Sequence, residues 1–443
     1  MDKDNRISEW RQASKERAKM LDQRLQHFLK PVASEIAHHL DLRLMRTWMQ
    51  LIRVIFIHRH RNEGGWISAL GSYLLPPLQA EAGRKRVTRM IHSPDWDIRP
   101  IETFLWQQAD ERIGELEAQG SDIWLVWDES EIEKAESQKA EGLMPVRSSK
   151  ASRLTRNTSM SGKPVFVSGV PWVQLIITGM KGHLTLAQMR WWSKQGPQAS
   201  NQRAVEGQLL IETYQRWGKR VVHTWDRGFA SHPWLGQAIQ QGVRFVVRWP
   251  RRYLLDDAQE MSLKPSDFTR RIRSWGHGEL SDLQRRCKVK IGVAAVPVWL
   301  DQHPLWLVVA RRGAGKEAWY FLTNEPAENF EQAWRIVAGY TRRWQIEMSF
   351  RCNKSEFAFE SPRLHQWEHR CKLLSLLTLA YAFLLSLLDI DALELRHWLL
   401  DNWCHRTGKR NREVSAPLYR LRQAIQRLWL SYPPPGLPLL NTG

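Results

Sequence analysis

The longest apolar stretch of the chain, Leu373 to Ile390 (LLSLLTLAYAFLLSLLDI), limits the possible folds more than any other segment. Only four of its 18 residues are polar, namely Ser375, Thr378, Ser386 and Asp389, so lipid or protein has to cover it on every side. The stretch is short for a membrane span, stands alone and closely follows a charged segment. We therefore expect a helix buried at the centre of the protein, and no membrane partner.

The charge of the chain predicts a polyanionic partner. Lys and Arg number 65 against 46 acidic residues, a formal net charge of +19 over 443 residues. Net charge alone leaves nucleic acid, an anionic membrane and RNA of the ribosomal kind as alternatives. The four cysteines form no C-x-x-C pair, and the N-terminus lacks the apolar segment of a signal peptide. We therefore expect a cytoplasmic protein with reduced thiols.

Hydrophobic periodicity divides the chain into five expected regions around an α/β core. They are a helical module expected to bind DNA (1–115), the first part of the core (116–250), an antiparallel β insertion (251–325), the second part of the core with the helix that carries Glu347 (326–395), and a basic helical region with a disordered tail (396–443). In the first region, the basic run GRKRVTRMIH is either a DNA-contacting surface or a solvated helix face, and the sequence favours neither.

Five polar residues between Tyr340 and Lys354 share one face of a predicted helix. In YTRRWQIEMSFRCNK, a rotation of about 100° per residue brings Arg343, Glu347 and Arg351 into the same arc of about 80° as the other two. A solvated helix scatters its charges, and a core helix excludes them. One carboxylate among three cations on one face instead indicates a surface that binds something anionic and also holds a metal ion.

Two aspartates that close predicted strands are candidates for further metal ligands. Asp128 ends the run IWLVWD, and Asp226 ends RVVHTWD. Ligands bind at the carboxyl ends of strands in open α/β sheets, and two-metal phosphoryl transfer needs carboxylates that converge from different elements. Glu347 would be the third ligand. Each acid alone has a simpler explanation as a turn former or as one half of a local ion pair.

The spacing Tyr340, two residues, Arg343, three residues, Glu347, six residues, Lys354 resembles a known signature. It is the Tyr-Arg-Glu-Lys signature of bacterial insertion-sequence transposases in the DDE superfamily. The resemblance covers roughly residues 120–390 and includes WYFLTNEP before the signature and RFVVR after the second aspartate. It implies a ribonuclease-H-like core with a β insertion between the second aspartate and the glutamate.

The resemblance also implies a role for each candidate residue. The expected triad of catalytic and metal-binding carboxylates is Asp128, Asp226 and Glu347, which would hold two Mg²⁺ ions, with Mn²⁺ as a substitute. The expected DNA contacts are Tyr340, Arg343, Lys354, Arg351 and Arg248, and Trp319 would stack on a flipped base. One departure is that Glu129 follows the first aspartate where a small hydroxyl residue is expected.

The function implied is that of a cut-and-paste transposase. Such a protein would bind the inverted repeats at both ends of its element, cleave one strand at each end, form a DNA hairpin and insert the element into target DNA. Work on two ends implies a homodimer in the synaptic complex, and the bacterial setting implies association with the nucleoid. Two alternatives are a non-catalytic DNA-binding derivative that acts as a repressor or architectural factor, and a basic RNA-binding protein.

Overall fold

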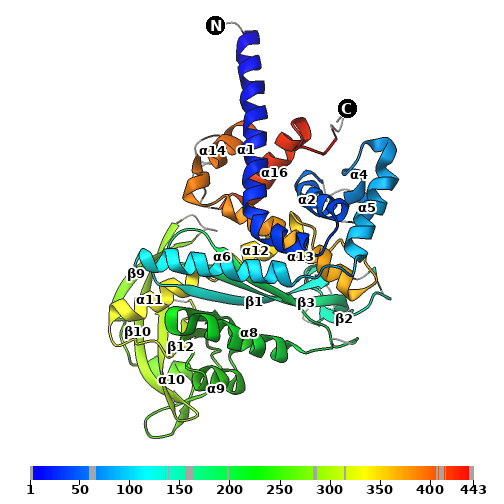
Figure 1. Cartoon of the computed structure of the whole chain (residues 1–443). Coiled ribbons are helices and arrows are strands. Elements are labelled where there is room, and N and C mark those ends of the chain that lie inside the picture. Colours follow the sequence, from blue (N-terminus) through cyan, green and yellow to red (C-terminus); the bar gives the residue numbers. More distant parts are fainter. Residues whose placement is uncertain are drawn as a thin grey trace.

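A mixed β-sheet runs through the centre of the protein and carries helices on both faces, with a further group of helices stacked above one end (Figure 1). The structure is a computed structural model that describes residues 3–58, 66–134, 136–137, 139–154, 163–196, 199–282, 287–313, 316–405, 408, 414 and 416–438. The expected α/β class is confirmed as a mixed α/β architecture.

The described residues contribute twelve strands to this sheet. They are β1 (Trp124–Glu133), β2 (Met144–Arg147), β3 (Phe166–Thr178), β4 (Thr185–Trp191), β5 (Val222–Trp225), β6 (Phe245–Arg248), β7 (Leu255–Asp256), β8 (Ser262–Leu263), β9 (Gly276–Asp282), β10 (Cys287–Leu300), β11 (His303–Arg311) and β12 (Trp319–Thr323).

The longer helices cover the sheet and form the upper group. They are α1 (Lys3–Ala37), α2 (Leu42–Ile57), α5 (Ala80–His92), α6 (Arg99–Ala118), α8 (Gln202–Trp217), α9 (His232–Gln240), α11 (Phe330–Thr341), α12 (Trp344–Ser355), α13 (Trp367–Ser386), α14 (Leu393–Asn402) and α16 (Leu418–Ser431). The short helices are α4 (Ile67–Ser72), α7 (Ser149–Leu154) and α10 (Pro265–Thr269).

The direction of the strands changes across the sheet. β4, β3 and β1 are antiparallel neighbours, whereas β1, β5 and β6 are parallel. Parallel pairing requires a crossover, and α8 and α9 lie in the connections that lead to β5 and β6. From β6 the sheet continues through β12, β11 and β10 as antiparallel pairs, so the strands of 251–325 extend the central sheet.

Helix α13 is the buried central helix expected from the apolar stretch. From Arg370 to Leu385 every residue is buried, and the helix contacts α2, α5, α6, α12, α16 and β4. The helix ends at Ser386, earlier than the apolar run does. Within the described residues no single helix has the length and hydropathy to cross a membrane. The two helical segments Trp367–Ser386 and Ile390–Asn402 meet these criteria only as a pair bent by 79°.

One hydrophobic cluster joins both ends of the chain. It contains Leu25 of α1, Trp48 of α2, Phe383 of α13 and Trp429 of α16, among many others. The helical module and the C-terminal helices are therefore stabilised by the same apolar core. Most of the basic segment 405–412 and residues 439–443 of the expected tail lie outside the described residues; after Ser431 the described chain is not helical.

The single helix predicted from Tyr340 to Lys354 is wrong. The segment is divided between α11, which ends at Thr341, and α12, which begins at Trp344. The amides of Arg342 and Arg343 bond to carbonyl groups three residues back, a tighter turn than that of an α-helix. The side chain of Arg342 donates to Gly182 O at 2.5 Å and Thr178 Oγ1 at 3.2 Å, which fixes this junction to the end of β3.

Candidate active site

The register of two parallel strands places Asp128 and Asp226 beside each other. Val126 of β1 is level with Thr224 of β5, and each aspartate lies two residues further along its own strand direction. Because side chains two residues apart point to the same face of a sheet, the two carboxylates lie level on one face. The sequence prediction that these acids converge therefore has a structural basis in strand pairing.

Asp128 lies inside a strand, so its prediction as a strand-closing residue is wrong. β1 continues to Glu133 because β3 runs beside it over the whole length, from Trp124 opposite Thr178 to Glu133 opposite Gly169. An aspartate that closes a strand is typically a turn former, but the chain does not turn after Asp128, and Glu133 at the end of β1 is buried and accepts hydrogen bonds from Ser148 and Ser149. Those bonds supply the polar partners that an acid in a strand requires.

The environment of Asp128 disfavours its charged form. The pKa of this carboxyl is raised to about 7, chiefly by burial; Arg343 opposes the rise, while Asp226 and Glu347 contribute to it. The mutual influence of three carboxylates shows that they share one electrostatic environment. Asp226 itself is held by the amide of Gly228, which donates to its Oδ1 at 2.7 Å at the start of a 3₁₀ turn.

A single guanidinium group links the strand acid to the helix acid. Arg343 Nη1 donates to Asp128 Oδ2 at 2.7 Å, and Nη2 donates to Glu347 Oε1 at 2.5 Å. Burial alone would lower the pKa of Arg343, but Tyr340, Asp128 and Glu347 raise it above its ordinary value. Glu347 therefore does form the local ion pair with Arg343 that is the simpler explanation for its presence. The same arginine also pairs with Asp128 in the sheet.

Sequence reasoning missed a second link between α12 and the sheet. Gln174 of β3 is the cross-strand neighbour of Asp128, and its Nε2 donates to Ser349 Oγ at 2.5 Å. Both side chains are fully buried. A buried glutamine opposite a serine carries no sequence signal until the strand register is known. This hydrogen bond fixes α12 two residues beyond Glu347, so it positions the glutamate relative to β1.

Glu129 points to the opposite face of the sheet from Asp128. It accepts a hydrogen bond from Gln202 Nε2 at 2.5 Å, and Gln202 also donates to Glu206 at 3.0 Å. Burial raises the pKa of Glu129 to about 10, and the neighbouring Glu206 adds to the rise. Glu129 therefore contacts α8 and takes no part in the cluster around Asp128.

The other polar residues predicted to surround Glu347 do not all lie close to it. Tyr340 is half-buried on α11 against Phe321, with ring centroids 4.6 Å apart, and burial raises its pKa to about 12. Lys354 is half-buried; burial lowers its pKa, whereas Glu360 and Glu131 raise it, so it faces the far end of β1. Arg351 is exposed. The structure thus groups Tyr340, Arg343 and Glu347 and leaves the other two further along α12.

Arg248 and Trp319 meet across neighbouring strands. The guanidinium carbon of Arg248 lies 5.0 Å from the centroid of a Trp319 ring, and that of Arg312 lies 4.5 Å from it. Burial lowers the pKa of Arg248 to about 10. The half-buried indole is therefore engaged by two cations, of which Arg312 was not among the residues selected from the sequence.

The donor types at the site suit a hard divalent cation. Asp128, Asp226 and Glu347 offer only carboxylate oxygens, which Mg²⁺ prefers. In the part of the chain that the structure describes, however, no group of three or more metal-ligating side chains is close enough to hold an ion. The reason at this site is visible in the hydrogen bonds, because a guanidinium cation lies between Asp128 and Glu347 and neutralises them.

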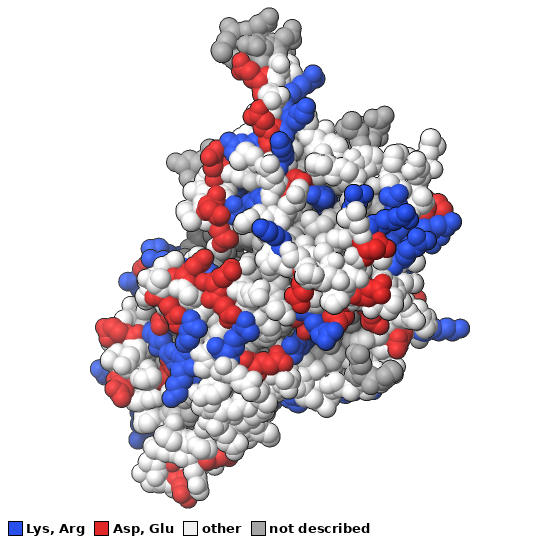
Figure 2. Space-filling view, viewed as in Figure 1, with Lys and Arg blue, Asp and Glu red and all other residues white. Residues whose placement is uncertain are grey.

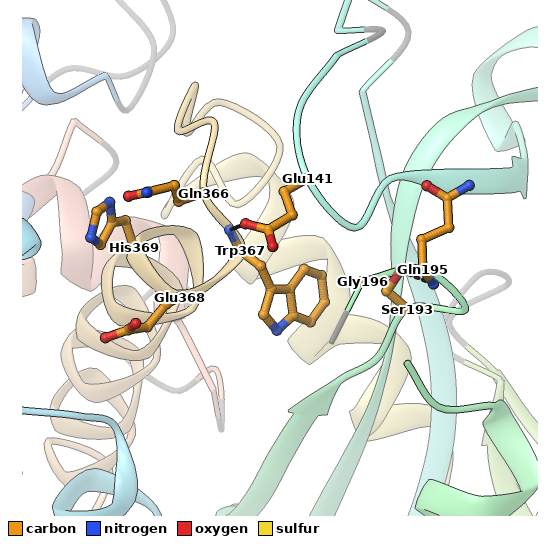
Figure 3. Close-up of a pocket in the computed structure, with 8 residues that line it drawn as sticks. All are labelled: Glu141, Ser193, Gln195, Gly196, Gln366, Trp367, Glu368 and His369. Atoms are coloured by element: carbon orange, nitrogen blue, oxygen red, sulfur yellow. Dashed lines mark hydrogen bonds between the residues drawn. The ribbon is translucent and has the colours of Figure 1, made fainter. Parts of the chain in front are cut away.

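A cavity of about 340 Å³ lies away from the candidate site. It is lined by Glu141, Ser193, Gln195, Gly196, Gln366, Trp367, Glu368 and His369 (Figure 3). Several of these groups are already engaged: Glu141 accepts from the amide of Trp367, Glu368 pairs with Lys372, and the ring of His369 stacks on that of His92 with centroids 3.9 Å apart. None of the residues predicted for catalysis or DNA contact lines this cavity.

Part of this chain is similar in sequence to the DDE domain of transposases. Residues 174–383 match the family model of the transposase DDE domain. The match includes Asp226, Glu347 and the whole Tyr340–Lys354 segment but begins after Asp128. The cryo-EM structure of a piggyBac transposase synaptic complex with hairpin DNA is similar at a TM-score of 0.42 and 12% identity, over 93% of this chain and 78% of that chain.

Proposed function

We propose that this protein is a cut-and-paste DNA transposase of the Tyr-Arg-Glu-Lys group. In this proposal it binds terminal inverted repeats, cleaves DNA in a metal-dependent reaction and transfers the freed strand to target DNA through a hairpin intermediate. The order β4, β3, β1, β5, β6 would be its ribonuclease-H-like core. A homodimer that joins the two ends of the element, in the bacterial cytoplasm, belongs to the same proposal.

The observation that carries the proposal is the convergence of three carboxylates from separate elements. Asp128 on β1 and Asp226, the residue directly after β5, are level with each other across two parallel strands, and Arg343 connects Glu347 to Asp128. One acid is enough to pair with Arg343, and the cap that Asp226 forms on a 3₁₀ turn needs no second acid beside it, so local stabilisation does not account for three carboxylates around one guanidinium. Two-metal phosphoryl transfer gives all three acids a function.

The same three carboxylates would hold the divalent cations. When bound, two such ions would supply Lewis acidity to the attacking and the leaving oxygen. The residues of this chain then have separate tasks: the sheet fixes Asp128 and Asp226, and the Gln174–Ser349 bond fixes the helix that carries Glu347. Arg343, which makes one hydrogen bond to each of two carboxylates, would exchange them for a DNA phosphate, since a guanidinium can bind two oxygens of one phosphate at once.

The remaining cations would hold the DNA beside the site. Lys354 and Arg351 on α12 would bind phosphates further along the duplex, and Tyr340 would donate its hydroxyl to one near Arg343. Arg248 contributes charge beside Trp319, whose indole would stack on an extruded base. These roles rest on the family resemblance; Tyr340 and Arg343 lie at the junction of α11 and α12, and Arg351 and Lys354 lie further along α12.

The test is cleavage of a labelled duplex that carries the terminal repeat of the element, with Mg²⁺ or with EDTA. Wild type is expected to cut at the repeat boundary only with Mg²⁺, and Glu347→Ala to lose cleavage by on the order of 10³-fold while it still binds the repeat. Tight binding by wild type without cutting would contradict the enzyme and favour the non-catalytic DNA-binding derivative. A Glu347→Ala variant that cuts at the wild-type rate would remove this residue from the triad.

A further inference from the structure

Helix α5 presents an exposed basic face that is separate from the candidate active site. The face consists of Lys85, Arg86 and Arg89, all exposed and within about 100° of one another around the helix axis. Figure 2 shows the basic patch over α5, on the right side of the molecule. This is the basic run for which the sequence left two alternatives open, a DNA-contacting surface or a solvated helix face.

The opposite side of α5 is anchored firmly. Val87, Met90 and Ile91 are fully buried in the cluster that also contains α2 and α13. At the start of the helix, α4 crosses α5 so closely that a Cβ on Gly83 would lie 2.1 Å from the carbonyl oxygen of Gly71. A helix backed in this way is held rigidly, so its basic face is presented in a fixed direction.

The charge of the face is almost uncompensated. Within α5 the one acidic residue is Glu81, which is paired with Arg84 at 2.8 Å and approached by Lys85 at 4.0 Å. Elsewhere on the surface acids and bases alternate: on α1 the exposed bases Arg11, Lys15 and Lys19 are interleaved with Glu9 and Glu16. A solvated helix face typically mixes both signs, as α1 does, whereas three bases together favour a polyanion.

We propose that the α5 face, Lys85, Arg86 and Arg89, is a second duplex-DNA-binding surface that anchors the terminal repeat away from the site of cleavage. The inference deepens the proposed function and rests on it for the identity of the DNA. A helix of this width fits the major groove of B-form DNA, and its long basic side chains reach the phosphates on either side. Helix α13, which contacts both α5 and α12, joins this surface to the helix that carries Glu347.

The test measures the affinity of the full-length protein for the labelled repeat duplex as a function of salt, in EDTA so that no cleavage occurs. The triple variant Lys85→Gln, Arg86→Gln, Arg89→Gln is expected to reduce the slope of log affinity against log salt by about 2–3, because each lost phosphate contact removes about 0.9 from it. The matched control, Arg11→Gln, Lys15→Gln, Lys19→Gln, removes the same charge from α1 and is expected to keep the wild-type slope.

Two further results would overturn the proposal. One is a triple α5 variant with the wild-type slope, and the other is an equal loss in the α1 control, which would show that only total charge matters. Arg86→Lys with Arg89→Lys keeps the charge and should keep the slope; thermal unfolding checks that each variant is folded. The same proteins are then supplied with Mg²⁺. If wild type binds through α5 but does not cut, the proposed enzyme fails while the α5 surface stands.

Discussion

The strands and the helical junction of the candidate site hold their acids by different means. Asp128 and Asp226 are positioned by backbone pairing between β1 and β5, which is part of the sheet itself. Glu347 is positioned by side chains: Arg343 bonds it to Asp128, and the Gln174–Ser349 bond fixes its helix. The backbone pairing of β1 and β5 holds the two aspartates rigidly. The position of Glu347 depends on a few side-chain contacts, each of which one substitution can remove.

This difference would suit a site that accepts DNA, as proposed above. The strand pair would keep the two aspartates at a constant separation, and at the junction between α11 and α12 the guanidinium of Arg343 would exchange its carboxylate partners for a phosphate. Substitution of Arg343 at the junction should therefore weaken DNA binding, whereas substitution of Asp128 or Asp226 should stop cleavage and leave binding intact.

The largest effect on stability is expected where α11 meets the sheet. A Cβ at Gly339 would lie 1.9 Å from Cζ2 of Trp124, whose ring is fully buried. Gly339→Ala should therefore lower the free energy of unfolding by about 3 kcal/mol and displace Tyr340 and Arg343, with loss of cleavage. Urea unfolding checks the first effect. The control Gly114→Ala has no heavy atom within 4 Å of its Cβ and should stabilise its helix by up to about 1 kcal/mol.

A change confined to the sheet should alter the pH dependence of folding. His223 of β5 is fully buried, neither ring nitrogen has a hydrogen-bond partner, and burial lowers its pKa to about 3. Since the unfolded chain takes up this proton below about pH 6.5, the wild-type protein loses stability as the pH falls from there toward 3. Relative to His223→Leu, this loss should reach about 2 kcal/mol at about pH 5. Equal pH profiles for the two proteins would contradict a buried, neutral histidine.

Removal of the link at the junction should have a smaller effect on stability. Arg343→Gln breaks both ion pairs, and because Glu347 is 38% exposed, solvent screens part of the loss. The free energy of unfolding should fall by about 1–2 kcal/mol, between the values for exposed and buried pairs. DNA binding should weaken with a shallower salt dependence. A variant as stable as wild type with unchanged binding would show that Arg343 is only a surface residue.

The smallest effect is expected at Lys354, further along α12. Lys354→Gln should reduce the salt slope for DNA binding by about 1 through the loss of one phosphate contact. The control is Lys290→Gln, an exposed lysine on β10 outside the candidate site. An unchanged slope for Lys354→Gln, or the same change in both variants, would count against a phosphate contact at this position.

Local pattern was enough to predict some parts of this molecule. The apolar run from Leu373 is short for a membrane span and stands alone, which predicts a buried helix, and α13 is that helix. Predicted strand ends and helix faces also indicate Asp128, Asp226 and Glu347 as candidate ligands; in the structure Asp226 lies level with Asp128, and Arg343 bonds to both Asp128 and Glu347, while their role as ligands stays a prediction. What made these predictions possible is that burial leaves a periodic signal in the sequence.

Local sequence pattern did not predict the features of the structure that depend on contacts between residues far apart in the sequence. The sequence predicts that the strand ends at Asp128, but pairing with β3 keeps the chain extended as far as Glu133. The helix from Tyr340 divides at Arg342, since that side chain bonds to residues about 160 positions earlier. Gln174 and Arg312 carry no motif at all, and only the register of the sheet reveals what they contact.

The most direct test of the central account is cleavage of the repeat duplex by Asp128→Asn, with Asp226→Asn beside it. Asp128 lies outside the range of the family match, and its assignment depends on its being level with Asp226 across β1 and β5. We predict that both variants bind the repeat duplex in EDTA as wild type does and fail to cut it with Mg²⁺. An Asp128→Asn variant that cuts at the wild-type rate while Asp226→Asn is inactive would contradict the shared site on which the account rests.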